Sequence, residues 1–408
     1  MWGKNAKLLV LTEPLWSLPM SWVFFYRPIF LRQSIGLSEV QMGFLFTILS
    51  FFTAFSPLAG GYLADRFGRK RIFMLFDSMG WLSAIAVWII TNNVWLAVVA
   101  YVLEGTAYVT YSVWECLLVE DTAPEYRASV YGTVSSVFSL GSLSTPIAGY
   151  IVGVYGIDQG VRLLFSLAFA SMVPMFTIRQ LYLRETEIGS QIMKEKTFAG
   201  LKGYLDSLSV IKRNRIIVAL LLTSTISTFY YSVSTYLPLY LIDERGLGLT
   251  KEAASLIPAA SSITGLVIAS LLVPRLTSRS GYMKSLSAGY ALGSLGILLL
   301  SFSPRDSLLL AMISGVVLGV YLGTSFAVSR TFLTNEIEEA DSRARAKILS
   351  ITVTLSYLLN LPSPALAGYL FSLEPKYPFI LVSGLLTASL VVLVLATRKR
   401  RMGANAAG

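Results

Sequence analysis

Residues 61–71 of the chain read Gly-Tyr-Leu-Ala-Asp-Arg-Phe-Gly-Arg-Lys-Arg, a short charged stretch between two long apolar runs. The apolar runs, 40–63 and 73–91, are each long enough to cross a bilayer as a helix. Only about nine residues connect these two predicted spans, so we expect the helices to be antiparallel neighbours. A tight turn this rich in Lys and Arg is typical of the cytoplasmic side of a membrane protein.

Composition indicates a membrane protein independently of this stretch, because 54% of the 408 residues are hydrophobic and only 14% are charged. A water-soluble domain does not carry so much apolar sequence. Apolar runs bounded by charges, prolines and glycines predict an all-α membrane protein with twelve transmembrane helices. The expected spans are 8–31, 40–63, 73–91, 94–119, 130–155, 162–183, 215–242, 252–274, 285–302, 307–330, 346–372 and 377–396.

The basic residues predict the orientation in a cell membrane, because short cytoplasmic loops carry the excess of Lys and Arg. An even number of spans puts both termini on one side, and we expect both to be cytoplasmic. The net charge of +10 then belongs to loops that face anionic lipid and cytoplasm, so no nucleic-acid partner is expected. In this orientation the outer half holds few basic residues, namely Arg27, Arg32, Arg162, Arg245, Lys251, Arg305 and Lys376.

Two residue types are nearly or wholly missing. The chain has one cysteine, Cys116, which excludes an intrachain disulfide, and it has no histidine. Proton-coupled chemistry would therefore have to use buried carboxylates, and the commonest ligand for soft transition metals is lacking. We expect neither a metal nor a cofactor. Without a P-loop or a G-x-S-x-G motif, an enzyme or an ATP-driven pump is not expected, and a membrane-embedded sensor is the remaining alternative class.

The quoted stretch resembles the loop between spans 2 and 3 of the major facilitator superfamily of secondary transporters, whose signature is roughly G-x-L-A-D-R-x-G-R-K/R. The resemblance implies two pseudo-symmetric six-helix bundles, 1–183 and 215–408, joined by a cytoplasmic linker, 184–214. It also implies a small-molecule substrate and a monomer in the lipid bilayer. The matching residues are Gly61, Leu63, Ala64, Asp65, Arg66, Gly68, Arg69 and Lys70.

Weak internal similarity supports two related halves. The stretch 145–150, Thr-Pro-Ile-Ala-Gly-Tyr, resembles 363–369, Ser-Pro-Ala-Leu-Ala-Gly-Tyr, with one residue inserted. Glu120-Asp121 followed by Arg127 corresponds to Glu336 followed by Arg343. Transporters commonly arise from such duplication.

In the family, the Asp of the loop signature and its basic neighbours hold the cytoplasmic ends of the two halves together. Asp65 takes this role by resemblance, near the positive N-terminus of span 11. Ser278 stands at the corresponding position of the second half, so the clasp is expected on one side only. The alternative is a basic turn that only sets topology. The expected gating residues are Asp65, Arg66, Gly68, Arg69, Lys70, Glu120, Asp121 and Arg127, with Arg66 or Arg69 near Glu120, Asp121 or Glu336.

Span 5 resembles the signature G-x8-G-x3-G-P-x2-G-G of the drug/proton antiporter branch. Thr145 and Tyr150 replace two of its glycines, and close helix packing is the alternative explanation of the small residues. The matching residues are Gly132, Gly141, Pro146 and Gly149.

Span 4 departs from that branch, because Tyr101 stands where its R-x-x-x-G motif has an arginine. A polar row follows, Glu104, Tyr108, Tyr111 and Glu115, and on a continuous α-helix its ends return to within about 20° of one face. Such a row should face a cavity or protein. Glu104 is the first choice for a proton-carrying or substrate-pairing group, and a structural pairing with a residue such as Arg27 is the alternative.

Other polar groups in the predicted spans are weaker candidates. Glu13 either lines the inner vestibule or relieves the turn loosened by Pro14. Asp77 is expected to pair with Arg71 or Arg127, and Arg27 to snorkel toward the outer surface. The remaining candidates for the substrate or proton pathway are aromatic or hydroxyl-bearing, namely Trp22, Tyr26, Tyr230 and Ser234.

Together these features predict a secondary active transporter that exports a small organic or amphipathic compound in exchange for protons. The alternative is proton symport, or facilitated uptake, of a sugar, an organic acid or another small metabolite, because carboxylates in a cavity serve either scheme.

Overall fold

The computed structural model describes residues 2–195, 211, 214–272, 275–276, 278–341 and 345–405, and every regular element within them is a helix. The helices, with one 3₁₀ turn η1, are α1 (Lys4–Thr12), α2 (Pro14–Gln33), α3 (Glu39–Phe67), α4 (Arg69–Ile90), α5 (Val94–Ala107), η1 (Tyr108–Thr110), α6 (Tyr111–Val119), α7 (Pro124–Leu143), α8 (Thr145–Tyr182), α9 (Glu187–Glu195), α11 (Arg215–Ser234), α12 (Leu237–Ile242), α13 (Lys251–Ala254), α14 (Leu256–Leu271), α15 (Arg279–Ser301), α16 (Leu308–Asp341), α17 (Arg345–Leu359), α18 (Ser363–Leu373) and α19 (Tyr377–Asn405).

Ten helical stretches of the described residues are long and apolar enough to cross a membrane. One of them, Ser129–Tyr182, holds two of the predicted spans, because the backbone leaves the helical region at Gly156, where φ is 76°. Helix resumes at once, so the loop expected between residues 155 and 162 is a single residue. The eleventh predicted span is present as two shorter helices, α17 and α18. The fold is thus the predicted all-α fold of twelve spans.

Several spans are divided into two helices, and a proline follows most of the breaks. Glu13 separates α1 from α2 just before Pro14. Span 5 breaks at Ser144 before Pro146, and span 7 breaks before Pro238. Proline has no N–H to donate to the preceding turn, so a helix restarts more easily than it continues there.

Span 4 is divided without a proline. The span expected over residues 94–119 is present. The prediction that it is one continuous α-helix is wrong, because the 3₁₀ turn η1 separates α5 from α6. A 3₁₀ turn has three residues per turn, and it therefore shifts the faces of the two flanking helices relative to each other.

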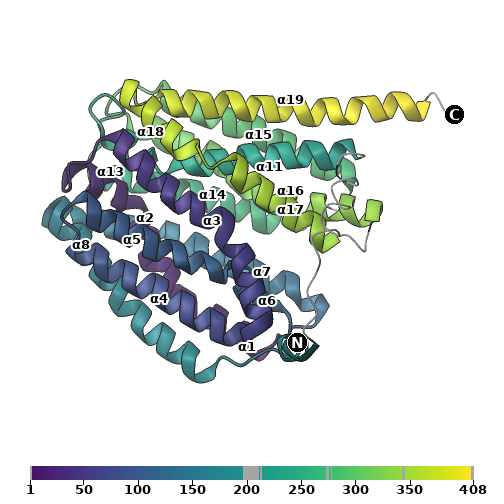
Figure 1. Cartoon of the computed structure of the whole chain (residues 1–408). Coiled ribbons are helices and arrows are strands. Elements are labelled where there is room, and N and C mark those ends of the chain that lie inside the picture. The colour runs from purple at the N-terminus through teal and green to yellow at the C-terminus, as the bar shows by residue number, and fades with distance from the viewer. Residues whose placement is uncertain are drawn as a thin grey trace. The chain divides into compact units, whose positions relative to one another are not determined.

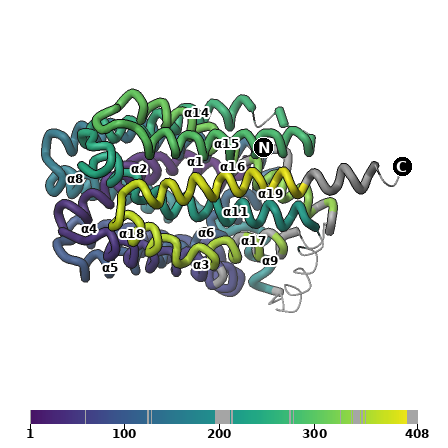
Figure 2. The backbone as a smooth tube through the Cα atoms, turned by 90° about the horizontal axis from the view of Figure 1, so that it is seen from above, coloured from purple at the N-terminus to yellow at the C-terminus, as the bar shows by residue number. Residues whose placement is uncertain are grey.

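The chain divides into two compact units. Unit 1 comprises Met1–Phe198, Thr250–Ser255 and Pro364–Ser372, and unit 2 comprises Ala199–Leu249, Leu256–Ser363 and Leu373–Gly408. In unit 1, α8 packs on α2 and α4, and α4 packs on α5 (Figure 1). In unit 2, α16 packs on α14 and α15, and α19 packs on α11 and α15 (Figure 2).

The predicted linker 184–214 falls mostly outside the described residues, at 196–210 and 212–213. Its first part contains the short helix α9, whose sequence is strongly amphipathic.

The turn quoted first from the sequence is built on Gly68, which separates α3 from α4 with φ 94°. We expect Gly68→Ala to lower the melting temperature of the detergent-purified protein, measured by scanning fluorimetry. A positive φ costs a non-glycine residue about 1–3 kcal/mol, and the new Cβ would lie 2.9 Å from Glu185 Oε2.

Gly61→Ala is the matched control from the same motif. A Cβ on Gly61, inside α3, has no neighbouring atom within 4 Å, so its melting temperature should stay the same or rise. Equal melting temperatures for the two variants would contradict the steric account of the turn.

Candidate functional site

Unit 1 contains a buried ion pair between span 1 and span 4. Arg27 on α2 donates from Nη1 to Glu104 Oε2 on α5, over 2.5 Å. Glu104 is 1% exposed and Arg27 is 6% exposed. A charge removed from water in this way requires a partner, and each residue supplies the partner of the other.

Three aromatic rings surround the Arg27 guanidinium. Its central carbon lies 4.8 Å from the ring centroid of Tyr101 and 5.3 Å from those of Phe24 and Trp88. Tyr101 occupies the position where the antiporter pattern has an arginine, so in this chain span 1 supplies the guanidinium and span 4 supplies a ring. The second carboxylate oxygen of Glu104, Oε1, has no hydrogen-bond partner among the described residues.

Two expectations about this region are corrected. Arg27 does not snorkel, because its side chain turns into unit 1 and is buried there. The row that begins at Glu104 crosses η1, and its exposure is uneven: Tyr108 and Glu115 are half-buried, whereas Tyr111 is 41% exposed. Each of these three residues interacts with its surroundings. Glu104 is thus the row's most buried member.

A second buried cluster joins spans 1, 3 and 6. Arg179 on α8 donates from Nη2 to Glu13 Oε2 over 2.7 Å and from Nε to Thr12 Oγ1 over 2.9 Å. Its Nη1 lies 3.6 Å from Asp77 Oδ2 on α4. Glu13, Asp77 and Arg179 are all buried.

The partner of Asp77 was predicted wrongly. Neither Arg71 nor Arg127 pairs with it, and Arg179 pairs with both Asp77 and Glu13. A signal existed in the sequence, since Arg179 lies inside the predicted sixth span, where an arginine needs an acidic partner.

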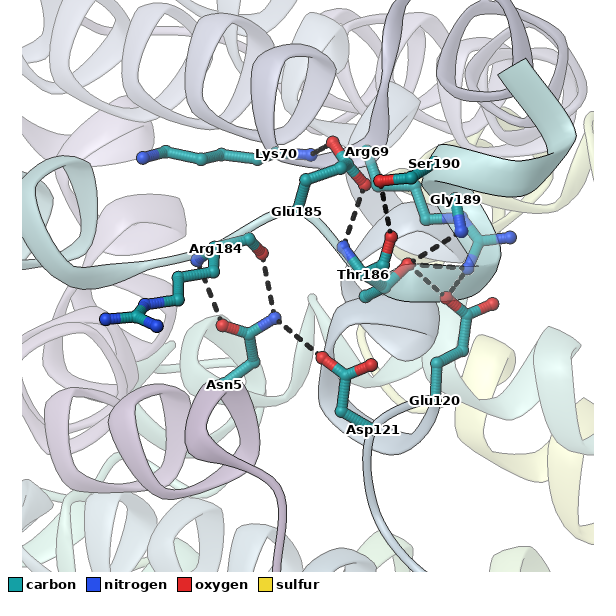
Figure 3. Close-up of polar contacts among 10 residues, drawn as sticks. All are labelled: Asn5, Arg69, Lys70, Glu120, Asp121, Arg184, Glu185, Thr186, Gly189 and Ser190. Atoms are coloured by element: carbon teal, nitrogen blue, oxygen red, sulfur yellow. Dashed lines mark hydrogen bonds and ion pairs between the residues drawn. The ribbon is translucent and has the colours of Figure 1, made fainter. Parts of the chain in front are cut away.

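A third network closes the end of unit 1 near the basic turn (Figure 3). Arg69, the first residue of α4, forms an ion pair with Glu120 at the end of α6. Thr186 joins both, because its Oγ1 donates to Glu120 Oε2 over 2.7 Å and accepts from Arg69 Nη1 over 3.3 Å. Glu185 Oε2 accepts from the backbone N–H of Lys70 over 2.9 Å. The beginning of span 3 is thereby tied to the residues that follow spans 4 and 6.

Asp121 lies beside this network. Its Oδ2 is 3.4 Å from Asn5 Nδ2, and the same amide donates to the carbonyl of Arg184 over 2.9 Å. Asn5 also accepts from the Arg184 N–H over 3.0 Å, so it ties the start of the chain to the segment after α8.

Two of the predicted gating residues make contacts elsewhere. Arg66 donates to the Tyr62 hydroxyl over 3.2 Å, and Arg127 donates to the carbonyl of Thr122 over 3.1 Å. Asp65 is half-buried, and its expected clasp on span 11 stays a prediction.

Unit 2 contains an ion pair that corresponds to the pair of Arg69 and Glu120 in unit 1, but its arginine stands three residues earlier in the motif. Arg279, the first residue of α15, donates from Nη2 to Glu336 Oε2 on α16 over 2.5 Å. Ser278 caps the same helix by accepting from the Gly281 N–H over 3.0 Å. When the two halves are compared by sequence, Arg279 corresponds to Arg66. By position in the structure it corresponds to Arg69, because Arg279 is the first residue of α15 and Arg69 is the first residue of α4.

The glycines of the antiporter-like motif differ in their surroundings. A Cβ on Gly141 would lie 2.6 Å from the carbonyl oxygen of Ser17, so α7 and α2 approach closely there. A Cβ on Gly149 would overlap the Ser255 hydroxyl, whereas one on Gly132 has no atom within 4 Å. Pro146 lies in the first turn of α8. Helix packing accounts for Gly141 and Gly149.

The aromatic candidates of span 1 have specific partners within unit 1. Trp22 Nε1 donates to Ser144 Oγ over 2.7 Å, at the break between α7 and α8. The Tyr26 hydroxyl donates to the carbonyl of Lys251 on α13 over 2.8 Å. Both therefore lie against other helices.

In unit 2, Tyr230 belongs to an aromatic cluster in which Tyr230 and Tyr321 are buried and Tyr231 is 47% exposed. Its ring centroid lies 5.5 Å from that of Tyr231 and 5.2 Å from that of Tyr321. Ser234 donates from Oγ to the carbonyl of Tyr231 over 2.7 Å. The side chains that meet here carry hydroxyls and rings without charge.

The described residues contain no group of three or more His, Cys, Asp or Glu side chains that could hold a metal ion. The arrangement offers buried acid–base pairs, which can bind and release protons or pair with a charged solute.

Comparisons with known proteins identify the family of the chain and proteins of the same fold. A family model described as Major Facilitator Superfamily matches residues 17–360. The cis,cis-muconate transport protein of Acinetobacter baylyi is 22% identical over 356 residues, covering 84% of this chain and 81% of that protein. Multidrug resistance protein 2 of Bacillus subtilis is 24% identical over 352 residues, covering 84% and 83%. The crystal structure of the nucleoside transporter NupG has the same fold, with a TM-score of 0.71 at 13% identity over 97% of this chain and 99% of the other.

The cluster around Arg179 predicts a non-additive pair of substitutions. We expect Asp77→Asn to change the melting temperature little, because Glu13 still neutralises Arg179. Combining it with Glu13→Gln leaves a buried guanidinium without a carboxylate, which costs about 3–5 kcal/mol. Scanning fluorimetry of the two purified variants tests this, and a single variant as unstable as the double would show that the two carboxylates do not share the role.

Proposed function

Because the chain is a member of the Major Facilitator Superfamily, we propose that it exports a small organic or amphipathic compound in exchange for protons. That it is a membrane transporter and not an enzyme follows from the family. The exchange of protons for an exported solute is our proposal, and the observation that carries it is the buried pair of Arg27 and Glu104.

The aromatic rings around Arg27 would offset part of the cost of protonating Glu104. If Glu104 takes up a proton, Arg27 loses its counter-charge but keeps the faces of Phe24, Trp88 and Tyr101. Cation–π contacts of this kind are worth about 2 kcal/mol or more where water is excluded. The bare Oε1 of Glu104 provides a position for the proton.

One comparison favours export, in addition to the resemblance of the span 5 sequence to the antiporter motif. A relative over most of the chain is a multidrug resistance protein.

The proposal includes the predicted organisation of the transporter. The transporter would be a monomer in the cell membrane, with both termini cytoplasmic. Its two bundles, 1–183 and 215–408, are joined by the linker 184–214, and their movement would expose the binding site to each side of the membrane in turn. Asp65 would hold the outward-facing state, while Arg69 and Glu120 fix the helix ends beside it.

Uptake of an organic acid is the second candidate, and one observation favours it. The relative of similar coverage from Acinetobacter baylyi is named for cis,cis-muconate, a dicarboxylate. A guanidinium held by aromatic rings could exchange the carboxylate of Glu104 for one on a solute.

Flux through purified protein in liposomes separates these schemes. Solutes of each charge class are supplied with and without an imposed pH gradient. Export predicts that an amphipathic solute moves against the proton flow, whereas uptake predicts that an organic acid accumulates along it. The absence of any solute-linked proton movement would exclude proton coupling in either direction.

Glu104→Gln tests the assignment of the proton. We expect the variant to bind or exchange its solute but to lose the dependence of transport on the pH gradient, because an amide takes up no proton in this range. Asp158→Asn, at an exposed acid near the outer turn, is the control and should keep that dependence. Retained pH-dependent transport in Glu104→Gln would remove the assignment.

Asp65→Asn tests the gate. We expect it to shift the population toward inward-facing states, seen as increased labelling of cysteines placed on the cytoplasmic side in a Cys116→Ser background. Ser278→Asn at the corresponding position of unit 2 keeps a helix-capping side chain and should not change the labelling. Unchanged labelling and transport in Asp65→Asn would eliminate the gating role.

A further inference from the structure

A hollow of about 460 Å³ lies where the first turns of α4 meet the end of α8 in unit 1. It is separate from the Arg27–Glu104 pair, which lies deeper in the spans. The side chains that line the hollow are Lys70, Arg71, Met74, Leu75, Gln180 and Glu185.

Two cations line the hollow, and neither forms an ion pair among the described residues. Within the described part of the chain, the Lys70 ammonium and the Arg71 guanidinium form no ion pair, whereas the neighbouring arginines, Arg69 and Arg179, are both paired. A guanidinium and an ammonium at one rim are the groups that recognise a phosphate.

The carboxylate in the hollow does not neutralise them. Glu185 accepts two backbone N–H groups, from Lys70 over 2.9 Å and from Thr186 over 3.1 Å. In Figure 3 the Lys70 side chain runs away from this carboxylate. The hollow thus has two positive side chains and one carboxylate, which is held by backbone N–H groups. The net charge of these three side chains is +1, which suits a ligand with a single negative charge.

The inner side of the hollow is apolar. Met74 and Leu75 follow Lys70 and Arg71 by one helical turn, and Leu75 is 53% exposed. At the end of α8, next to Gln180 in the chain, Leu181 and Tyr182 are also exposed apolar side chains. The two spans that form the hollow begin at Arg69 and end at Tyr182, which places it where headgroups meet hydrocarbon.

We propose that this hollow binds the phosphate of an anionic phospholipid headgroup. Lys70 and Arg71 contact the phosphate, Gln180 supplies a polar side chain at the rim, and Leu75 and Met74 contact the upper acyl chain. A free phosphate ion has the same charged group but would make no contact with the apolar side chains of the hollow. We therefore favour a phospholipid over free phosphate as the ligand.

The test measures lipid retained by the purified full-length protein. Protein in mild detergent is titrated with phosphatidylglycerol or phosphatidylcholine, and bound lipid is counted by native mass spectrometry. Wild type should retain phosphatidylglycerol in preference to phosphatidylcholine. Lys70→Gln/Arg71→Gln should reduce phosphatidylglycerol binding roughly tenfold or more, because each basic residue at an anionic surface contributes appreciably.

Lys4→Gln/Lys7→Gln is the matched control, because it removes two exposed basic side chains from α1 of the same unit. It should leave retention unchanged. An equal loss in both double variants would indicate general surface attraction and overturn the site, as would wild-type retention in Lys70→Gln/Arg71→Gln.

A second variant and a second ligand complete the test. Arg71→Glu, at an exposed position, should reduce phosphatidylglycerol binding even if the double variant purifies poorly. Inorganic phosphate at millimolar concentration should neither displace the lipid nor raise the melting temperature. If it does both, the site takes free phosphate and the lipid assignment is overturned.

Discussion

The energetic cost of a charge among apolar helices is the constraint on which unit 1 depends. An arginine buried within a span without a carboxylate would destabilise the bundle by several kcal/mol. Arg27 meets Glu104, Arg179 meets Glu13 and Asp77, and Arg69 meets Glu120. Because each pair joins different spans, the pairs fix how the helices are rotated about their axes. Apolar contacts alone would leave several rotations nearly equal in free energy.

The two halves resemble each other most clearly at the first residues of α4 and α15. Arg69 opens α4 and Arg279 opens α15, and each pairs with a glutamate at or near the end of span 4 or span 10. By sequence, however, Arg279 corresponds to Arg66, which lies three residues before Arg69. The difference arises at the turn: Gly68 precedes α4 with a positive φ, whereas Ser278 caps α15 and Gly281 lies in its first turn. The ion pair is thus tied to the first position of the helix.

The fold could be predicted from the sequence because apolar length is a property of single segments. Twelve runs of sufficient length, together with the stretch 61–71, were enough for the fold and the family. The pairing of charges was harder to predict, since it depends on which faces of distant helices meet. Glu104 was recognised as a residue of interest and its pairing with Arg27 was considered, but Arg179 was overlooked as the partner of Asp77. The row of Glu104, Tyr108, Tyr111 and Glu115 is unevenly exposed because η1 interrupts the helix, and no residue in η1 is a proline that would have indicated the break.

Gly156 makes the link between two spans only one residue long. The left-handed backbone at this glycine reverses the chain so sharply that a Cβ on Gly160 would lie 2.9 Å from the Cα of Val152. With no free loop between them, spans 5 and 6 form one antiparallel hairpin, and their connection can lengthen only if a helix end unwinds.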